Sequence, residues 1–192
     1  MALPSPAPRL SYEEYLALET KTDTRHEWLR GEAWAMAGGS VAHATIQANT
    51  LRLLGNALEG RPCMAYGSDL KVRIEETDRA TYPDVTVVCG PREVSATDPN
   101  AIVNPTLIVE VLSSTTEASD RGEKFAHYRR IPSLRDYVLI SQDERRVEVF
   151  HRDGESSAWT LREHGPGPGA RLRLPALDLE LDVDTLYRDP TG

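Results

Sequence analysis

Residues Thr106-Leu107-Ile108-Val109-Glu110-Val111-Leu112 predict a central strand covered on both faces, because a nearly continuous apolar run of this length is typical of such a strand. The stretch Tyr82-Pro83-Asp84-Val85-Thr86-Val87-Val88 has the same character. Each run carries one carboxylate, Glu110 in the first and Asp84 in the second. The sequence therefore predicts two buried strands that each contain an acidic residue.

These two carboxylates need a compensating partner. An ionised carboxylate in apolar surroundings costs several kcal/mol unless a metal ion, an arginine or several amides compensate it. Carboxylates from adjacent strands can converge on one divalent cation, and Mg²⁺ accepts hard oxygen ligands together with water. Such an ion polarises a phosphoryl oxygen and acidifies its bound water. Asp84 and Glu110 are therefore the first candidates for a reactive centre.

The helix after the second strand supplies the candidate cation. Ser114-Thr115-Thr116-Glu117 fits a capping box, and the helix is expected to run to about Arg130. Leu112 occupies the strand position that shares a face with Glu110, so the strand offers no lysine there. Asp120, Lys124 and Tyr128 recur every four residues and lie on one stripe of the helix. If this stripe faces the strand ends, Lys124 provides the positive charge.

Further elements are predicted on either side of this core. Ser11 caps a short helix, the segment 25–36 alternates around Gly31 as a hairpin, and Ser40 precedes a helix that runs to about Leu58. Leu70, Val72 and Ile74 alternate with Lys71 and Arg73, which predicts a half-buried strand with both cations in water. The segment 90–105 is predicted to be an irregular surface loop. Later strands are expected at 136–140, 146–150 and 158–161, followed by a last edge strand and a short turn within 172–183.

Length and composition bound the class of protein. The 192 residues are 40% hydrophobic, which favours one domain over residues 11–188 behind a flexible arm at 1–10. The formal charge is -8 and the pI is about 5.2, so a polyanion would have to meet a local basic patch. Cys63 and Cys89 lie far apart and suggest neither a disulfide framework nor a thiolate zinc site. With no signal peptide and no membrane-spanning run, a cytoplasmic protein without a membrane partner is expected.

Several segments together resemble one known family. They are Glu27 to Glu32, His43 at the head of the long helix, Pro83-Asp84-Val85, Glu110-Val111-Leu112-Ser113, and Asp120-Arg121-Gly122-Glu123-Lys124 with Tyr128. In their order and spacing the chain resembles the Uma-two family of restriction-endonuclease-like proteins, within the PD-(D/E)XK nuclease superfamily. The match covers most of the chain from about Tyr12 to Phe150.

The resemblance implies a fold and an activity. The expected fold is an α/β (α+β), restriction-endonuclease-like mixed sheet flanked by helices, with extra antiparallel strands at the C-terminal end. The implied chemistry is hydrolysis of DNA phosphodiesters with Mg²⁺ or Mn²⁺ on Asp84 and Glu110, Glu27 as a further ligand and metal-bound water as the nucleophile. Leu112 departs from the superfamily pattern, so Lys124 inherits the role of the missing strand lysine.

Each candidate also has a structural interpretation. Lys124 could be an ordinary solvated helix residue, Glu27 a surface strand residue, and His43 a polar residue that hydrogen-bonds locally at a helix start. Tyr128 suits packing more than chemistry, and it is a cleft candidate together with His43 and Asp120. The tryptophans Trp28, Trp34 and Trp159 are most simply core or interface anchors.

Three functional hypotheses remain open. The first is a metal-dependent endonuclease-like hydrolase acting on DNA, with a homodimer as its plausible assembly because a double-strand cut needs two sites. The second is a catalytically weak or inactive nuclease-fold module that binds nucleic acid or a protein. The third is a hydrolase of a small phosphodiester.

Overall fold

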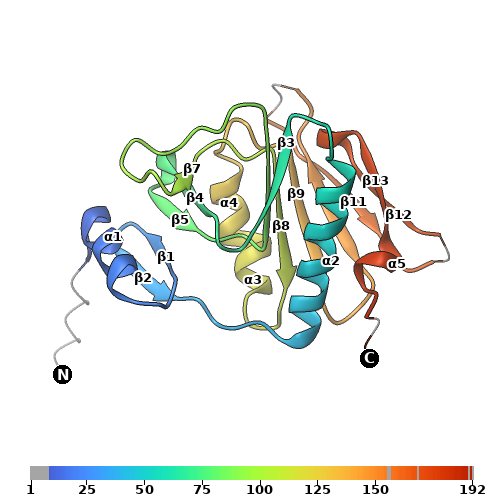
Figure 1. Cartoon of the computed structure of the whole chain (residues 1–192), viewed down its shortest axis with the longest axis horizontal. Coiled ribbons are helices and arrows are strands. Elements are labelled where there is room, and N and C mark those ends of the chain that lie inside the picture. The colour runs from blue at the N-terminus through green and yellow to red at the C-terminus, as the bar shows by residue number, and fades with distance from the viewer. Residues whose placement is uncertain (1–8, 155–156, 168, 190, 192) are drawn as a thin grey trace.

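A six-stranded mixed sheet forms the centre of the computed structural model, which describes residues 9–154, 157–167, 169–189 and 191 (Figure 1). Its strand order is β11-β10-β9-β8-β6-β3. The bounds are β3 (Cys63–Gly67), β6 (Val85–Cys89), β8 (Leu107–Leu112), β9 (Asp136–Ser141), β10 (Val147–His151) and β11 (Thr160–His164). Strands β8 and β9 pair in parallel and every other neighbouring pair is antiparallel. The predicted mixed sheet is confirmed.

Both faces of β6 and β8 are covered, which explains their apolar sequences. On one face Val85, Val87, Val109 and Val111 pack against α2 (Val41–Ala57) through Ile46 and Leu54. On the other face Ile108 and Leu112 pack with Tyr128 and Leu139. Val85 pairs with Val109, so the same register places Asp84 next to Glu110 at the end of the strand pair.

A second sheet of five strands lies on the N-terminal side, in the order β2-β1-β5-β4-β7. The bounds are β1 (His26–Leu29), β2 (Glu32–Ala35), β4 (Lys71–Ile74), β5 (Arg79–Thr81) and β7 (Ala101–Ile102), with a 3-10 turn η1 (Glu75–Thr77) before β5. Helix α1 (Tyr12–Lys21) begins at the predicted Ser11 cap, which the structure shows as a capping box with Glu14, and packs Tyr15 against Trp28. The predicted hairpin around Gly31 is β1–β2.

The helix after β8 differs in detail from its prediction. It consists of α3 (Glu117–Ser119), a π-helical turn η2 (Asp120–Lys124) and α4 (Phe125–Tyr128). The Ser114 capping box is wrong, because the Ser113 carbonyl accepts the Glu117 amide at 2.9 Å and the Ser113 hydroxyl accepts the Thr116 amide at 3.3 Å. Ser113, the residue directly after β8, therefore accepts these hydrogen bonds at the helix start in place of Ser114.

The C-terminal part forms a hairpin of its own where a single edge strand was predicted. Strands β12 (Arg171–Leu174) and β13 (Leu179–Asp182) pair with each other, joined by η3 (Pro175–Leu177) and followed by α5 (Val183–Leu186). Leu172, Leu181 and Leu186 join the core beneath α2. Figure 1 shows this hairpin beside α2, so the extra C-terminal antiparallel strands are confirmed.

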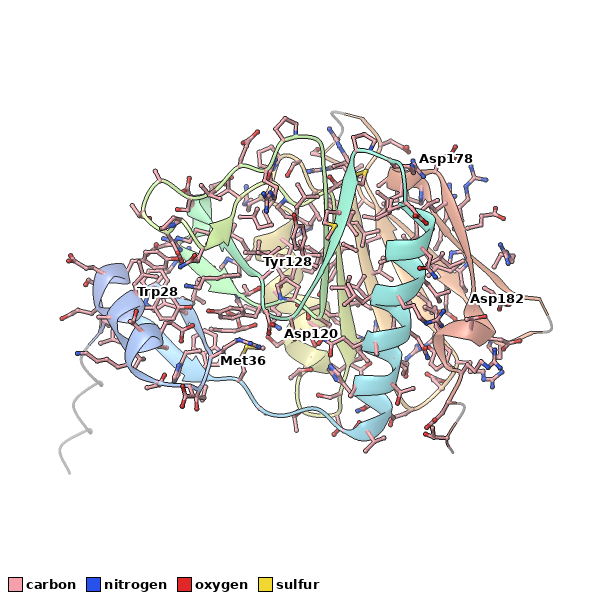
Figure 2. All side chains as sticks on the ribbon, viewed as in Figure 1. Trp28, Met36, Asp120, Tyr128, Asp178 and Asp182 are labelled. Atoms are coloured by element: carbon pink, nitrogen blue, oxygen red, sulfur yellow. A yellow bond between two sulfur atoms is a disulfide. The ribbon has the colours of Figure 1, made fainter. Side chains whose placement is uncertain are left out.

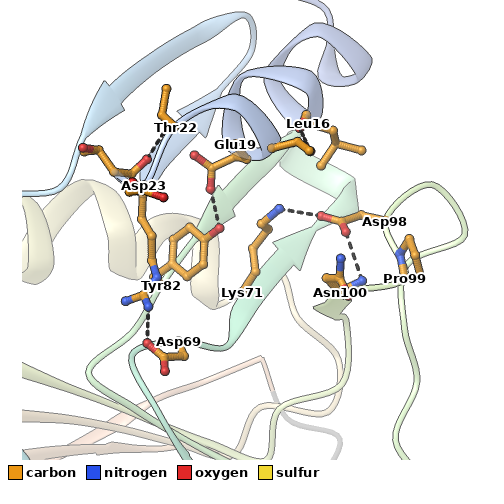
Figure 3. Close-up of a pocket in the computed structure, with 13 residues that line it drawn as sticks. Leu16, Glu19, Thr22, Asp23, Asp69, Lys71, Tyr82, Asp98, Pro99 and Asn100 are labelled. Atoms are coloured by element: carbon orange, nitrogen blue, oxygen red, sulfur yellow. Dashed lines mark hydrogen bonds and ion pairs between the residues drawn. The ribbon is translucent and has the colours of Figure 1, made fainter.

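Lys71 and Arg73 were predicted to face water, and this is wrong. Their exposed fractions are 5% and 7%. The Lys71 ammonium lies 2.8 Å from Asp98 Oδ2 and over the rings of Tyr15 and Tyr82 (Figure 3). Lys71 and Arg73 alternate with the apolar side chains of β4. They contact α1 and the loop before β7, so both faces of the strand are covered.

The prediction for the cysteines is also wrong. Cys63 and Cys89 stand opposite each other in the antiparallel pair β3–β6 and form a disulfide with a Cα–Cα distance of 4.0 Å. Their separation of 26 residues concealed this contact, because sheet register alone brings the two strands together.

The predicted arm at 1–10 lies mostly outside the described residues. None of the helices in the described part of the chain is long and apolar enough to cross a membrane.

The buried Lys71–Asp98 pair gives the first testable prediction. Lys71→Met leaves Asp98 buried without its cation, so the free energy of unfolding is expected to fall by about 3–5 kcal/mol. Arg145→Met is the control, because it breaks the exposed pair with Asp184 and should cost at most about 1 kcal/mol. Urea denaturation measures both changes, and equal effects would contradict a special role for the buried pair.

Candidate functional site

The site is centred on the ammonium group of Lys124, which is surrounded by three carboxylates. Its Nζ lies 3.1 Å from Glu27 Oε1, 3.4 Å from Glu110 Oε1 and 3.1 Å from Asp120 Oδ1. The Lys124 side chain is only 12% exposed. Figure 2 shows Asp120 and Tyr128 near the middle of the molecule. The interpretation of Lys124 as a solvated helix residue is therefore wrong.

The π-helical turn η2 sets this geometry. It places Asp120 and Lys124 on the side of the helix that faces β8, and Tyr128 follows one turn later. The Tyr128 hydroxyl donates to Glu110 Oε1 at 2.8 Å, and the Tyr137 hydroxyl donates to the Asp120 carbonyl at 2.9 Å. The stripe Asp120, Lys124 and Tyr128 does face the strand end, as the spacing predicts. π-helical turns within α-helices occur frequently at functional sites.

Asp84 stands at the start of β6 and is held from two sides. Its Oδ2 accepts the backbone amide of Val111 at 2.7 Å, and its Oδ1 lies 2.8 Å from His43 Nε2. Gln47 donates to the Asp84 carbonyl at 3.0 Å. His43 therefore lines the site across 41 positions of sequence, and the interpretation of a locally bonded helix-start residue is wrong. Its hydrogen bond to Asp84 raises the pKa of His43 above its usual value.

Burial dominates the electrostatics of Glu110. Desolvation raises the pKa of Glu110 to about 8, and the charges of Asp120, Asp84 and Glu27 add to the rise while Lys124 opposes it. The site thus holds more negative charge than one lysine neutralises. The Tyr128 hydroxyl remains protonated, since burial first and the charge of Glu110 second raise the pKa of Tyr128 well above 10.

Lys124 stays charged despite its burial. Desolvation alone would lower the pKa of Lys124, but the charges of Glu110, Glu27 and Asp120 outweigh it and raise that pKa well above 10.5. The ammonium is therefore a fixed positive charge at neutral pH. A cation held in this way can stabilise negative charge that develops on a reacting group.

Arg79 is a buried neighbour of this cluster that sequence reasoning missed. Its guanidinium is 1% exposed and lies 3.3 Å from Glu27 Oε2 and 3.0 Å from Glu123 Oε1. Glu27 is therefore buried with one oxygen toward Lys124 and the other toward Arg79, and the interpretation of Glu27 as a surface residue is wrong. Nothing in the local sequence marks Arg79, but the excess of candidate carboxylates over cations could have suggested a second buried cation.

The carboxylates of the site include donors of the kind that a divalent cation binds. Asp84 and Glu110 present hard oxygen ligands on adjacent strands in a site with excess negative charge, which suits Mg²⁺ or Mn²⁺. Glu110 Oε2 accepts no hydrogen bond from the residues that the structure describes. Within the same residues, no three acidic, histidine or cysteine side chains are arranged as a ready-made metal site. Asp84 and Glu110 are therefore the residues whose donor chemistry suits a divalent cation, but among the described residues they do not form a complete ligand set by themselves.

A separate pocket of about 420 Å³ lies between the end of α1, the start of β4 and the loop before β7 (Figure 3). Glu19, Lys71, Tyr82 and Asp98 line it, and none of the residues around Lys124 does. Each of these four polar groups already has a partner within the protein. The pocket is therefore not part of the Lys124 site.

The mixed sheet, the acidic residues at neighbouring strand ends and the lysine on the next helix define a restriction-endonuclease-like α/β protein. The chain belongs to the Uma2 family, whose description is "Putative restriction endonuclease" and whose pattern matches residues 12–184. Two Synechocystis relatives, the uncharacterized proteins slr1290 and sll1609, are 39% identical over 184 residues and 35% identical over 154 residues. The alignments cover 96% and 80% of this chain, and 94% and 86% of those proteins.

A solved structure confirms the fold. It is the crystal structure of an Anabaena variabilis protein described as "a putative nuclease belonging to DUF820", with a TM-score of 0.74. The superposition covers 93% of this chain and 97% of the other, at 19% sequence identity. The identity is low, so this likeness supports the arrangement of the sheet and helices alone.

The raised pKa of Glu110 predicts how stability depends on pH. Between the ordinary carboxyl pKa of about 4.5 and about 8, the folded protein binds a proton on Glu110 that the unfolded chain releases. The contribution of Glu110 to the free energy of unfolding is therefore complete below about pH 4.5. It is lost as the pH rises through about 8. Glu110→Gln should flatten this part of a profile of unfolding free energy against pH, whereas Glu163→Gln on exposed β11 should leave it unchanged. A profile that Glu110→Gln does not alter would contradict this assignment.

Proposed function

We propose that this protein is a divalent-metal-dependent endonuclease-like hydrolase that cleaves DNA phosphodiesters. The observation that carries the proposal is the position of the buried Lys124 ammonium among Glu27, Glu110 and Asp120, with Asp84 at the adjacent strand end. Family membership supports the nuclease class. The order of these residues also fits the acidic pair and lysine that the sequence resemblance implies.

Each side chain has a defined task in this proposal. Asp84 and Glu110 would hold the Mg²⁺ or Mn²⁺, which when bound polarises the phosphoryl oxygen and acidifies water. The backbone amide of Val111 and His43 fix the Asp84 carboxylate, and Tyr128 fixes that of Glu110. Lys124 stabilises the negative charge that develops on phosphorus oxygens.

Glu27 is better suited to orient Lys124 than to serve as a metal ligand. Both of its oxygens already face cations, Lys124 on one side and Arg79 on the other. Coordination would have to compete with these two buried ion pairs, whose loss leaves uncompensated charge. We therefore place Glu27 beside Asp120 as a positioning residue for the ammonium.

The second candidate function is a nuclease-fold module that binds DNA or a protein without cleaving DNA. The observation in its favour is that the Lys124 ammonium already occupies the space between Glu27, Glu110 and Asp120. The net charge of -8 also opposes tight binding of a polyanion. Titration with Mn²⁺ and nicking of supercoiled plasmid separate the two candidate functions.

Metal binding is the first expected property. Calorimetric titration with Mn²⁺ should show binding that Asp84→Asn and Glu110→Gln each weaken at least about 10-fold, because each removes one charged oxygen ligand. Glu163→Gln is the matched control, since it makes the same carboxylate-to-amide change on the exposed strand β11. Absence of binding in the unsubstituted protein would favour the non-cleaving module.

Nicking of supercoiled plasmid in the presence of Mn²⁺ is the second expected property. Lys124→Ala should reduce the rate about 10²-fold or more, because it removes the group that stabilises developing charge. Lys21→Ala, at the exposed end of α1, makes the same substitution away from the site and should retain the wild-type rate. Equal nicking by both variants would identify a contaminating nuclease.

A further inference from the structure

Trp34 is an exposed aromatic residue on the same sheet face as the Lys124 site. It lies on β2, the outermost strand of the five-stranded sheet, and 39% of its surface is exposed. In the register of the β1–β2 hairpin Trp34 stands directly opposite Glu27. Opposite residues of an antiparallel pair point to the same face, so the indole lies beside the carboxylate that contacts Lys124.

The indole is anchored to the site through Arg79. The Arg79 guanidinium lies 5.9 Å from the centre of the Trp34 ring, within the range of a cation–π contact. The same guanidinium pairs with Glu27 and Glu123 and is almost completely buried. Trp34 therefore contacts the residue that pairs with Glu27 while 39% of its surface remains open to solvent.

The hairpin also carries one arginine, Arg30, besides the acidic residues Glu27 and Glu32. Arg30 lies exposed at its turn, and its Nε donates to the Thr77 carbonyl at 3.4 Å. Burial, and after it the charges of Arg79 and Arg30, lower the pKa of His127 on α4. Arg30 and Arg79 therefore both act on His127, which follows Lys124 on the same helix, while Glu123 opposes them.

The surroundings of Trp34 do not favour a protein partner. The other large exposed apolar side chains among the described residues lie on other elements: Val41, Met64, Val94 and Leu161. Glu32 on the same strand is exposed and charged. A lone aromatic ring among charged groups lacks the contiguous apolar patch of a protein-docking surface, but it suits a flat ligand with a charged backbone.

We propose that Trp34 is a stacking surface for an unpaired nucleobase of the DNA strand that enters the Lys124 site. This inference rests on the proposed function and deepens it by naming the form of DNA. Base–aromatic stacking tolerates any base sequence, because every base has a π-face, but it requires a base that is not stacked within a duplex. The protein therefore prefers single-stranded or frayed DNA, with Arg30 near the phosphates.

Binding of a short fluorescein-labelled oligothymidylate tests the proposal. Fluorescence anisotropy in Ca²⁺, with full-length protein, should show that Trp34→Leu weakens binding roughly 5- to 100-fold, whereas Trp34→Phe changes it by no more than about threefold. Binding of a blunt duplex should change much less in Trp34→Leu. Leu161→Ala, at an exposed apolar position on β11, should bind both DNAs like the unsubstituted protein. Thermal unfolding of each variant confirms that it is folded.

Several results would overturn this inference. They are unchanged oligothymidylate binding in Trp34→Leu, an equal loss for single-stranded and duplex DNA, or a wild-type dimer that Trp34→Leu dissociates in sedimentation without a change in DNA binding. Plasmid nicking is scored separately. Nicking with no effect of Trp34→Leu on binding retains the hydrolase and rejects the stacking surface, whereas Trp34-dependent binding without nicking retains the stacking surface and rejects the hydrolase.

Discussion

The interaction on which the structure of this site depends is the compensation of buried carboxylates by the Lys124 ammonium. Glu27, Glu110 and Asp120 come from β1, β8 and η2, so a single cation joins the two sheets and the helix between them. Each charge taken singly would be too costly to bury. Together they form a network of ion pairs. The same ion pairs stabilise the fold and determine the electrostatics of the site.

Two features of the backbone make this network geometrically accessible. The β6–β8 register brings Asp84 beside Glu110, and the π-helical turn directs Asp120 and Lys124 toward them. Arg79 completes the arrangement from β5 by neutralising the second oxygen of Glu27. The burial that raises the pKa of Glu110 is a consequence of this packing. In the proposed function a divalent cation would bind beside this network, at Asp84 and Glu110.

The distribution of charge explains how an acidic protein could meet DNA. The net charge of -8 means that attraction must be local, and the cations near the site lie on the β1–β2 hairpin, on β5 and on the η2–α4 helix. Trp34 adds an apolar contact that does not depend on ionic strength in the way that phosphate contacts do. In the proposed function the N-terminal sheet would orient the DNA, and the six-stranded sheet and the η2 turn would carry the chemistry.

The sequence by itself determined the buried strands with Asp84 and Glu110, the hairpin around Gly31, and the stripe of Asp120, Lys124 and Tyr128. Apolar runs, turn residues and helical spacing are local properties, so they can be recognised without a structure. Only the tertiary structure decided the partners: Arg79 against Glu27, His43 against Asp84, and Cys63 bonded to Cys89. The burial of Lys71 and Arg73 also depended on the tertiary structure. Such contacts depend on sheet register and on which elements cover a strand, and these are set by packing between segments far apart in the chain.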